Sequence, residues 1–542
     1  MKLSRISSFT AALLLTVSCC SCQSTRQRQM RVRDKDKEFR IGQTYAYKNR
    51  VDTSELNELA VNTPARKLLD DIESDSSEDV ISADINDLLD TYNTIYELNT
   101  LSTIQQCKND EDIDARINAN TAYLKLQSAN EIISYAFCRG YNSKYKELFS
   151  KYVNKSILYK YKDCSSSVFD LSIKVRDKLD KDIERVKEYD KIVADPELTP
   201  HEKDVKCAEV LLTILKDCGT DALFTNYNRD YSGEDVLKVS NAIKKYLLPA
   251  YDELSLTYLT TYEHQYGISA TIKEPFAIIQ KYAPEISEKF GKNADTLVNN
   301  DLYEISSSSN NIDVYFCDLL PKQKSAMIFI GAPSKNGDLL APALYTFGSF
   351  NSALINDSPA YLTCKNVDMQ ELYSLGAEPF FLQFYDDIYT EHGKFERLNI
   401  EYNMLESVIS GFFIGEFEYT VARDADKLTP EEVVERFNGL FEDFNYTYRL
   451  SDIKHMFADP GYYVSYGTSA LAAFDLYNDI YNHNDQEKAV RKYEDLSSIS
   501  ASSDSYTFCA ALKKAGFSDI MTEQYIKDLA DIIMKIDNEY TE

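Results

Sequence analysis

Histidines are the side chains of this sequence best suited to metal chemistry, and the chain contains five of them. A zinc hydrolase needs two neutral imidazoles one helical turn apart, so that both reach the same ion, and a carboxylate between them that takes the proton of the attacking water. No two histidines are close enough in the sequence to form such a pair; they are His201, His264, His392, His455 and His483. We therefore expect no resident zinc.

The sequence also lacks the patterns of two other metal sites. No Asp-rich loop of the calcium-binding type is present. The cysteines beyond residue 22 are scattered, and no two of them form the C-x-x-C spacing of a cysteine-rich zinc module. Disulfide pairing among these cysteines cannot be deduced from their spacing. We expect a protein without a metal or another cofactor.

The sequence predicts a mostly helical protein. From Ser54 to about Glu304, and again after Asp338, apolar residues recur every three or four positions, which predicts amphipathic helices. Thr199 and Thr429 each begin a T-P-x-E capping box, which marks a helix start. Two short apolar runs, one ending at Leu320 and one covering 325–330, are separated by Pro-Lys and predict a small sheet.

Four segments of the second half resemble one family of zinc peptidases. The first follows the apolar runs and a Gly337-Asp338 loop and reads Tyr-Thr-Phe-Gly-Ser-Phe-Asn at 345–351. The second is the acidic stretch 368–378, the third runs from 411 to 432, and the fourth is the His- and Tyr-rich stretch 455–466. In this order they resemble the oligoendopeptidase F and thimet oligopeptidase family, in which the first segment carries the zinc motif H-E-x-G-H.

The resemblance assigns roles to four residues of the first two segments. Tyr345 and Ser349 stand where the family has its two imidazoles, and Thr346 stands where it has the catalytic carboxylate. Glu371 matches the third zinc ligand and is the only ligand position retained. Hydroxyl groups of Tyr and Ser are poor zinc ligands near neutral pH, because the oxygen would have to lose a proton whose pKa is about 10 or above.

The fourth segment implies a place where a peptide binds. His455, Tyr463 and Tyr466 match side chains that contact substrate in active members of the family. With Glu371 they are our candidates for peptide-binding residues, whereas we assign Tyr462 to the packed core. The implied fold is mostly α, a large two-lobed helical ellipsoid with a small β-sheet beside a deep central cleft. The similarity covers the chain from about Asp313 to its end.

The replaced motif leads us to expect a protein that is not an enzyme. Ser349 has no neighbouring base that the sequence predicts, so a serine nucleophile is not supported either. The leading function is then the binding of a peptide or a protein partner in the former active-site cleft. Two alternatives stay open: an active peptidase that uses an unconventional site, and a structural surface lipoprotein.

The N-terminus resembles the leader of a bacterial lipoprotein. Lys2 and Arg5 precede an apolar run that ends in a Ser-Cys-Cys-Ser-Cys cluster. We expect a signal peptide over 1–22, lipidation of Cys19 or Cys20, and an extracytoplasmic protein anchored to the membrane, with plain secretion as the alternative.

The remaining organisation follows from charge and pattern. Residues 23–45 are polar and basic and predict a flexible tether. We expect an N-terminal helical region at 46–304 and a catalytic-like domain at 305–542. The formal net charge of −28 disfavours nucleic acid as a partner, because such binding depends on basic residues that neutralise phosphates.

Overall fold

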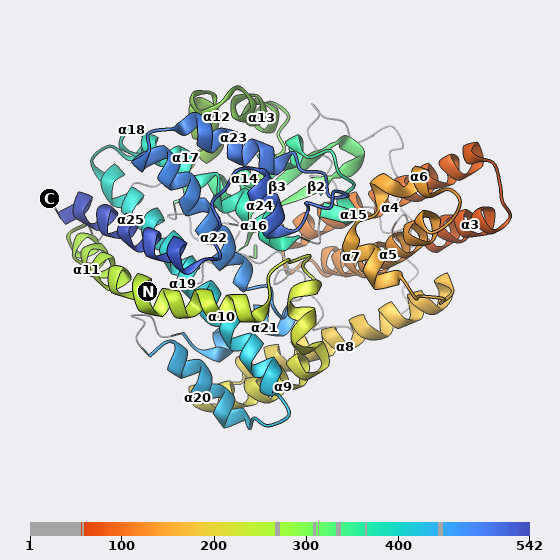
Figure 1. Cartoon of the computed structure of the whole chain (residues 1–542), viewed down its shortest axis with the longest axis horizontal. Helices are drawn as coiled ribbons and strands as arrows, with labels where there is room; N and C mark the ends of the chain where they lie inside the picture. The colour runs from red at the N-terminus through yellow and green to blue at the C-terminus, as the bar shows by residue number, and fades with distance from the viewer. Residues whose placement is uncertain are drawn as a thin grey trace. The chain divides into compact units, whose positions relative to one another are not determined.

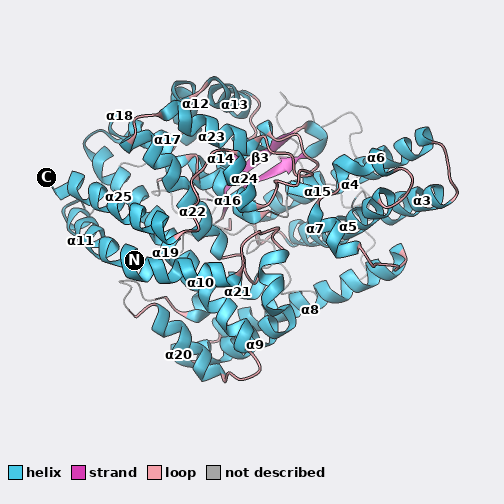
Figure 2. Ribbon diagram, in the orientation of Figure 1, coloured by secondary structure: helices cyan, strands magenta, loops and turns pink. Residues whose placement is uncertain are grey.

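Helices dominate the chain, as the computed structural model shows (Figures 1 and 2). The structure describes residues 56, 59–265, 272–306, 311–312, 314–331, 338–363, 366–442 and 448–541. It is 76% helical and contains one three-stranded sheet, so the predicted fold class is confirmed. Within these residues, no helix has both the length and the apolar character needed to cross a membrane. The central cleft stays a prediction.

The chain divides into two compact units that alternate along the sequence. The first takes the chain up to Lys187 together with 296–335 and 358–363, and the second takes 188–295, 336–357 and 364–542. We predicted a single boundary, with one region at 46–304 and another at 305–542. The units of the structure are divided differently, and the predicted domains stay a prediction. All residues discussed below as a candidate site belong to the second unit.

The first unit combines helices with the sheet. Its helices are α3 (Asn62–Glu73), α4 (Glu78–Lys108), α5 (Ile113–Tyr141), α6 (Lys146–Phe149), α7 (Lys155–Tyr161) and α15 (Ala360–Thr363). The long helices α4 and α5 pack against each other. Asp318 of the sheet accepts hydrogen bonds from Tyr96 at 2.8 Å and from Thr100 at 2.9 Å, both on α4. These bonds fix the sheet to the helix beneath it.

The sheet has the strand order β1-β3-β2. The two predicted apolar runs form β2 (Tyr315–Leu320) and β3 (Ser325–Gly331), which pair antiparallel with Tyr315 opposite Ile330. Strand β1 (Tyr303–Ser306) pairs parallel with β3 and lies where we predicted the end of the helical region. Four residues give too short a pattern to distinguish a strand, so that part of the prediction is wrong.

The second unit is helical throughout its described part. Its helices are α9 (Pro200–Thr225), α10 (Gly233–Ala242), α11 (Leu248–Gln265), α12 (Pro275–Ile286), α14 (Leu340–Ile355), α16 (Val367–Leu375), α17 (Glu378–Phe381), α18 (Tyr385–Tyr389), α19 (Gly393–Asp424), α20 (Pro430–Leu440), α21 (His455–Ala458), α22 (Val464–Tyr477), α23 (Gln486–Ser497), α24 (Phe508–Lys514) and α25 (Glu523–Thr541). Two further helices, α8 (Val168–Ala194) and α13 (Glu288–Asn299), cross the limits between the units. The capping boxes predicted at Thr199 and Thr429 begin α9 and α20.

Packed helices of the second unit position the candidate site. Helix α16 packs against α14 and against α22, and α22 packs along the long helix α19. Gly348 lets α14 approach α16 closely, because a Cβ atom at this position would lie 2.3 Å from the carbonyl oxygen of Tyr373. The hydroxyl of Tyr493 donates to the carbonyl oxygens of both Gly348 and Tyr373, at 3.0 and 2.6 Å, and so joins the two helices at this point.

Candidate functional site around Glu371

Glu371 lies at the centre of a buried group of polar side chains. It belongs to α16 and is 5% exposed. Its carboxylate accepts one hydrogen bond from the hydroxyl of Tyr345 on α14 and another from the hydroxyl of Tyr462, which lies just before α22. Burial raises the pKa of Glu371 to about 7, although the two tyrosine hydrogen bonds act in the opposite direction. The carboxyl group can therefore gain or lose a proton near neutral pH.

His455 lies beside Tyr462, one of the two tyrosines that donate to Glu371. Its imidazole stacks on the ring of Tyr462, with centroids 4.9 Å apart and an interplanar angle of 11°. The hydroxyl of Tyr466 lies 3.5 Å from Nε2, and Nδ1 has no hydrogen-bond partner among the described residues. Burial lowers the pKa of His455 to about 4, so the imidazole is neutral. We call Tyr345, Glu371, His455, Tyr462 and Tyr466 the Glu371 cluster.

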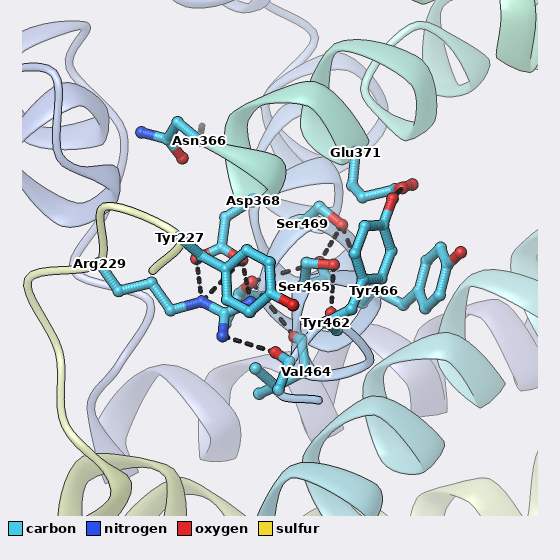
Figure 3. Close-up of polar contacts among 12 residues, drawn as sticks. Tyr227, Arg229, Asn366, Asp368, Glu371, Tyr462, Val464, Ser465, Tyr466 and Ser469 are labelled. Atoms are coloured by element: carbon cyan, nitrogen blue, oxygen red, sulfur yellow. Dashed lines mark hydrogen bonds and ion pairs between the residues drawn. The ribbon is translucent and has the colours of Figure 1, made fainter. Parts of the chain in front are cut away.

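The structure brings together three of the four predicted peptide-binding residues, of which Figure 3 shows Glu371 and Tyr466. Glu371, His455 and Tyr466 belong to the cluster. The ring of Tyr463 contacts Tyr466 and His455, with centroid distances of 5.3 and 6.1 Å, but its hydroxyl interacts with the side chain of Ser410 on α19. Tyr463 therefore lies next to the cluster and presents its polar atom to another helix.

The three residues at the motif positions face different groups. Tyr345 donates to Glu371, as described. The Ser349 hydroxyl, one turn along α14, lies 2.6 Å from the hydroxyl of Ser374 on α16. Thr346 is directed elsewhere, since its hydroxyl donates to the carbonyl oxygens of Pro342 and Ala343 in its own helix, at 2.8 and 3.2 Å. The spacing of 345 and 349 thus places two hydroxyls toward α16.

A buried ion pair adjoins the cluster (Figure 3). Nε and Nη2 of Arg229 donate to the carboxylate of Asp368 at 2.8 to 3.1 Å, and both side chains have 0% exposure. The Tyr231 hydroxyl also donates to this carboxylate, at 2.7 Å. Nη1 of Arg229 donates to the carbonyl oxygen of Gly461 at 2.6 Å. The guanidinium is therefore satisfied by a carboxylate and by the backbone of a distant turn.

The turn that precedes Tyr462 is held from several sides. Gly461 has φ +82°, a left-handed conformation, and a Cβ atom there would lie 2.5 Å from the carbonyl oxygen of Leu223, so glycine is required. The Gly461 N–H donates to Glu418 at 2.8 Å, and the Tyr227 hydroxyl donates to the carbonyl oxygen of Pro460 at 3.0 Å. These contacts fix the direction in which Tyr462 leaves the backbone.

Sequence reasoning missed two features of the site. We assigned Tyr462 to the packed core, and it is buried, yet its hydroxyl is one of the two donors to Glu371. The pair Arg229–Asp368 was not predicted because 139 positions separate its members. Asp368 could have been noticed, since it lies one helical turn before Glu371. No local pattern marks Arg229.

The donor atoms of the cluster do not fit the zinc ion that the family resemblance implies. Zinc in a hydrolase takes three protein ligands of the His, Asp, Glu or Cys type. Both oxygens of Glu371 accept tyrosine hydroxyls, and His455 is the only imidazole in the cluster. Among the described residues, no group of three or more His, Cys, Asp or Glu side chains could hold a metal ion. That the protein holds no zinc stays a prediction.

Comparison with solved structures identifies the fold. The chain is similar to an oligoendopeptidase F structure (TM-score 0.68, 15% identity, 90% of this chain and 97% of the other), to Pz peptidase A with an inhibitor (0.68, 13%, 91% and 98%) and to an oligoendopeptidase F from Bacillus anthracis str. Ames (0.67, 14%, 93% and 98%). No protein-family model and no curated protein sequence matches the chain.

These comparisons correct one prediction. We predicted from the replaced motif that the chain is not an enzyme, and this is contradicted, because the structures that share its fold over nearly their whole length are peptidases. The three replaced motif positions were too narrow a basis for that prediction. The chain has the fold of the oligoendopeptidases.

Proposed function

We propose that this protein binds oligopeptides at the Glu371 cluster. A peptide main chain presents N–H donors and C=O acceptors in alternation. Glu371 can accept from an N–H group, and the imidazole of His455 and the hydroxyl of Tyr466 can donate to a carbonyl oxygen. The observation that carries this proposal is the buried Glu371 carboxylate between two tyrosine hydroxyls, beside an imidazole whose Nδ1 has no partner among the described residues.

The burial of these groups supports a ligand-binding role over a packing role. An uncharged side chain of the same size would pack at lower cost, because a buried polar group must be compensated by hydrogen bonds. His455 is 7% exposed and leaves one ring nitrogen uncompensated within the described structure. A peptide carbonyl or amide at this nitrogen would supply the missing hydrogen bond.

Hydrolysis of the bound peptide is a second candidate function, favoured by the pKa of Glu371. A general base works best when its pKa lies near the operating pH, and that of Glu371 is about 7. In this reaction Glu371 takes a proton from water as the water oxygen attacks the peptide carbonyl carbon. The same proton then passes to the amide nitrogen as the C–N bond breaks. The hydroxyl of Tyr466 is the nearby donor for the developing oxyanion, because the hydroxyl of Tyr462 already donates to Glu371.

The location of the protein is a separate proposal. We propose that the chain is held on the outer side of a membrane by a lipid on Cys19 or Cys20, with residues 23–45 as the tether. These positions lie outside the described residues, and the support for the proposal is the basic, apolar and cysteine pattern of the leader. A peptide-binding protein in that place would meet peptides from the surroundings of the cell.

A direct experiment uses the absence of tryptophan from the chain. Because only the ligand would then contain tryptophan, the fluorescence anisotropy of short peptides with a single Trp reports their binding without a label. Saturable binding supports the first function, and new fragments in mass spectra of the same mixtures support the second. If no peptide in a set of varied sequence and length binds, the proposed function is wrong.

A further inference from the structure

Glutamates on helix α19 differ in the groups that neutralise them. Glu401 forms an ion pair with Arg397 at 3.1 Å. Glu416 accepts two hydrogen bonds from the ammonium of Lys244, at 2.9 and 2.7 Å. Among the described residues, Glu406 forms hydrogen bonds with hydroxyl groups and no ion pair. Of these three glutamates, two therefore have cations and Glu406 has only hydroxyl donors among the described residues.

The carboxylate of Glu406 lies beside the hydroxyl end of a group of stacked tyrosines. The Tyr251 hydroxyl donates to it at 3.3 Å and lies 2.7 Å from the hydroxyl of Tyr402. The rings of Tyr251 and Tyr402 stack with centroids 5.6 Å apart, and Tyr258 stacks on Tyr402 at 4.3 Å. Glu406 is half-buried, so part of its side chain is accessible to solvent.

The polar face around Glu406 continues along α19. Asn399, Asn403 and Glu406 are spaced at i, i+4 and i+7, which places them on one face of the helix, and all three are half-buried. The amide oxygen of Asn399 accepts from the Tyr258 hydroxyl at 3.0 Å and from Asn403 at 3.5 Å. This face has the amide and carboxylate groups that recognise a peptide main chain and a charged end.

Tyr463 connects this face to the Glu371 cluster. Its hydroxyl interacts with Ser410, and the Ser410 hydroxyl donates to the backbone carbonyl of Glu406 at 2.7 Å. On its other side the ring of Tyr463 contacts Tyr466 and His455, as described above. Tyr463 and Ser410 thus link the Glu406 backbone to the rings of the Glu371 cluster.

We infer that Glu406 is a subsite for a cationic group of the bound peptide, an ammonium at its amino terminus or on a lysine side chain. This inference rests on the proposed peptide binding. A half-buried carboxylate that has lost part of its hydration is stabilised by an opposite charge. The formal net charge of −28 draws cations toward the protein from solution.

The test compares pairs of Trp-containing peptides in which one member carries a positively charged group that the other lacks. In one series a single lysine, moved through each position, is compared with norleucine, which lacks the ammonium. In the other series a free amino terminus is compared with an acetylated one. We expect the wild type to favour a charged member of at least one series by roughly tenfold. The series in which this preference occurs identifies the source of the cation.

Matched variants then locate the preference. Glu406→Gln should abolish it, because the amide keeps the hydrogen-bonding shape and loses the charge, whereas Glu416→Gln should leave it intact. Equal melting temperatures for Glu406→Gln and wild type verify that the fold is kept. The inference is overturned if the wild type binds charged and neutral peptides equally, or if Glu406→Gln keeps the preference. If the wild type binds no peptide at all, the proposed function fails together with it.

Discussion

Arg229 and Asp368 form a fully buried ion pair in which three hydrogen bonds join the guanidinium to the carboxylate. Asp368 lies one helical turn before Glu371, and the carbonyl oxygen that Arg229 also binds belongs to the residue directly before Tyr462. The pair therefore connects the two backbone segments that carry the Tyr462–Glu371 hydrogen bond. Its effect on the site is indirect, through the placement of these segments.

The first prediction concerns the removal of one member of this pair. Arg229→Met should leave the Asp368 carboxylate buried without a cation and lower the free energy of unfolding by about 3–5 kcal/mol. The double variant Arg229→Met with Asp368→Leu should recover part of that loss, because no unpaired charge remains. Thermal unfolding of the three proteins measures this. A single variant as stable as the wild type would contradict the structural account of the pair.

The second prediction concerns the close approach of α14 and α16. Gly348→Ala should destabilise the protein by about 1–3 kcal/mol, since the new methyl group would collide with the Tyr373 carbonyl and move the helices apart. Gly439 in α20 has open space around the position of a Cβ atom. Gly439→Ala is the matched control and should stabilise slightly, by about 0.5–1 kcal/mol. Equal effects of both variants on the melting temperature would show that the helices do not meet closely at Gly348.

The third prediction is a pH dependence that arises from Glu371. Burial raises its pKa from an ordinary 4.5 to about 7 in the folded state. Between these values the native state binds more protons than the unfolded state, so the contribution of this group to stability is full at low pH and declines as the pH rises toward 7. The shift corresponds to about 3 kcal/mol.

Glu371→Gln removes this titration. The melting temperature of the variant relative to wild type should therefore increase as the pH is raised from about 5 to 8. Other buried carboxyl groups titrate in both proteins and cancel in the comparison. A difference in melting temperature that does not change with pH would mean that the Glu371 carboxyl group has no raised pKa in the folded protein.

The fourth prediction concerns the membrane anchor. Replacement of both Cys19 and Cys20 by Ser should move the protein from the membrane fraction to the soluble fraction, because no thiol would remain at either proposed lipidation position. Cys22→Ser alone is the control and should leave the protein in the membrane fraction. Fractionation followed by immunoblotting measures this. If the double variant stays with the membrane, the lipid lies elsewhere or the proposed anchor is wrong.

The local features of the fold could be predicted from the sequence. The capping boxes at Thr199 and Thr429 and strands β2 and β3 lie where their patterns indicated. These features depend on residues that are close together in the chain. Strand β1 was missed because a short edge strand depends on its pairing with β3, which no local pattern records.

The site was predicted in part, for a related reason. The resemblance placed Glu371, His455 and Tyr466 near one another, and the structure brings them together. It could not show which way a tyrosine hydroxyl points: Tyr462 donates to Glu371, whereas Tyr463 is directed to α19. These directions are set by tertiary packing and by the turn at Gly461. Arg229, which holds that turn, lies more than a hundred positions from the cluster segments.

The most direct test of peptide binding at the Glu371 cluster compares two tyrosine variants with the wild type. Tyr466→Phe removes a hydroxyl from the cluster. Tyr540→Phe is the control, since it removes a hydroxyl that donates at 2.8 Å to Glu401, a carboxylate outside the cluster. With a peptide that the wild type binds, Tyr466→Phe should weaken binding by roughly two- to tenfold without a lower melting temperature, and Tyr540→Phe should leave the affinity unchanged. Equal affinity of wild type and Tyr466→Phe, or an equal loss in both variants, would contradict binding at this cluster.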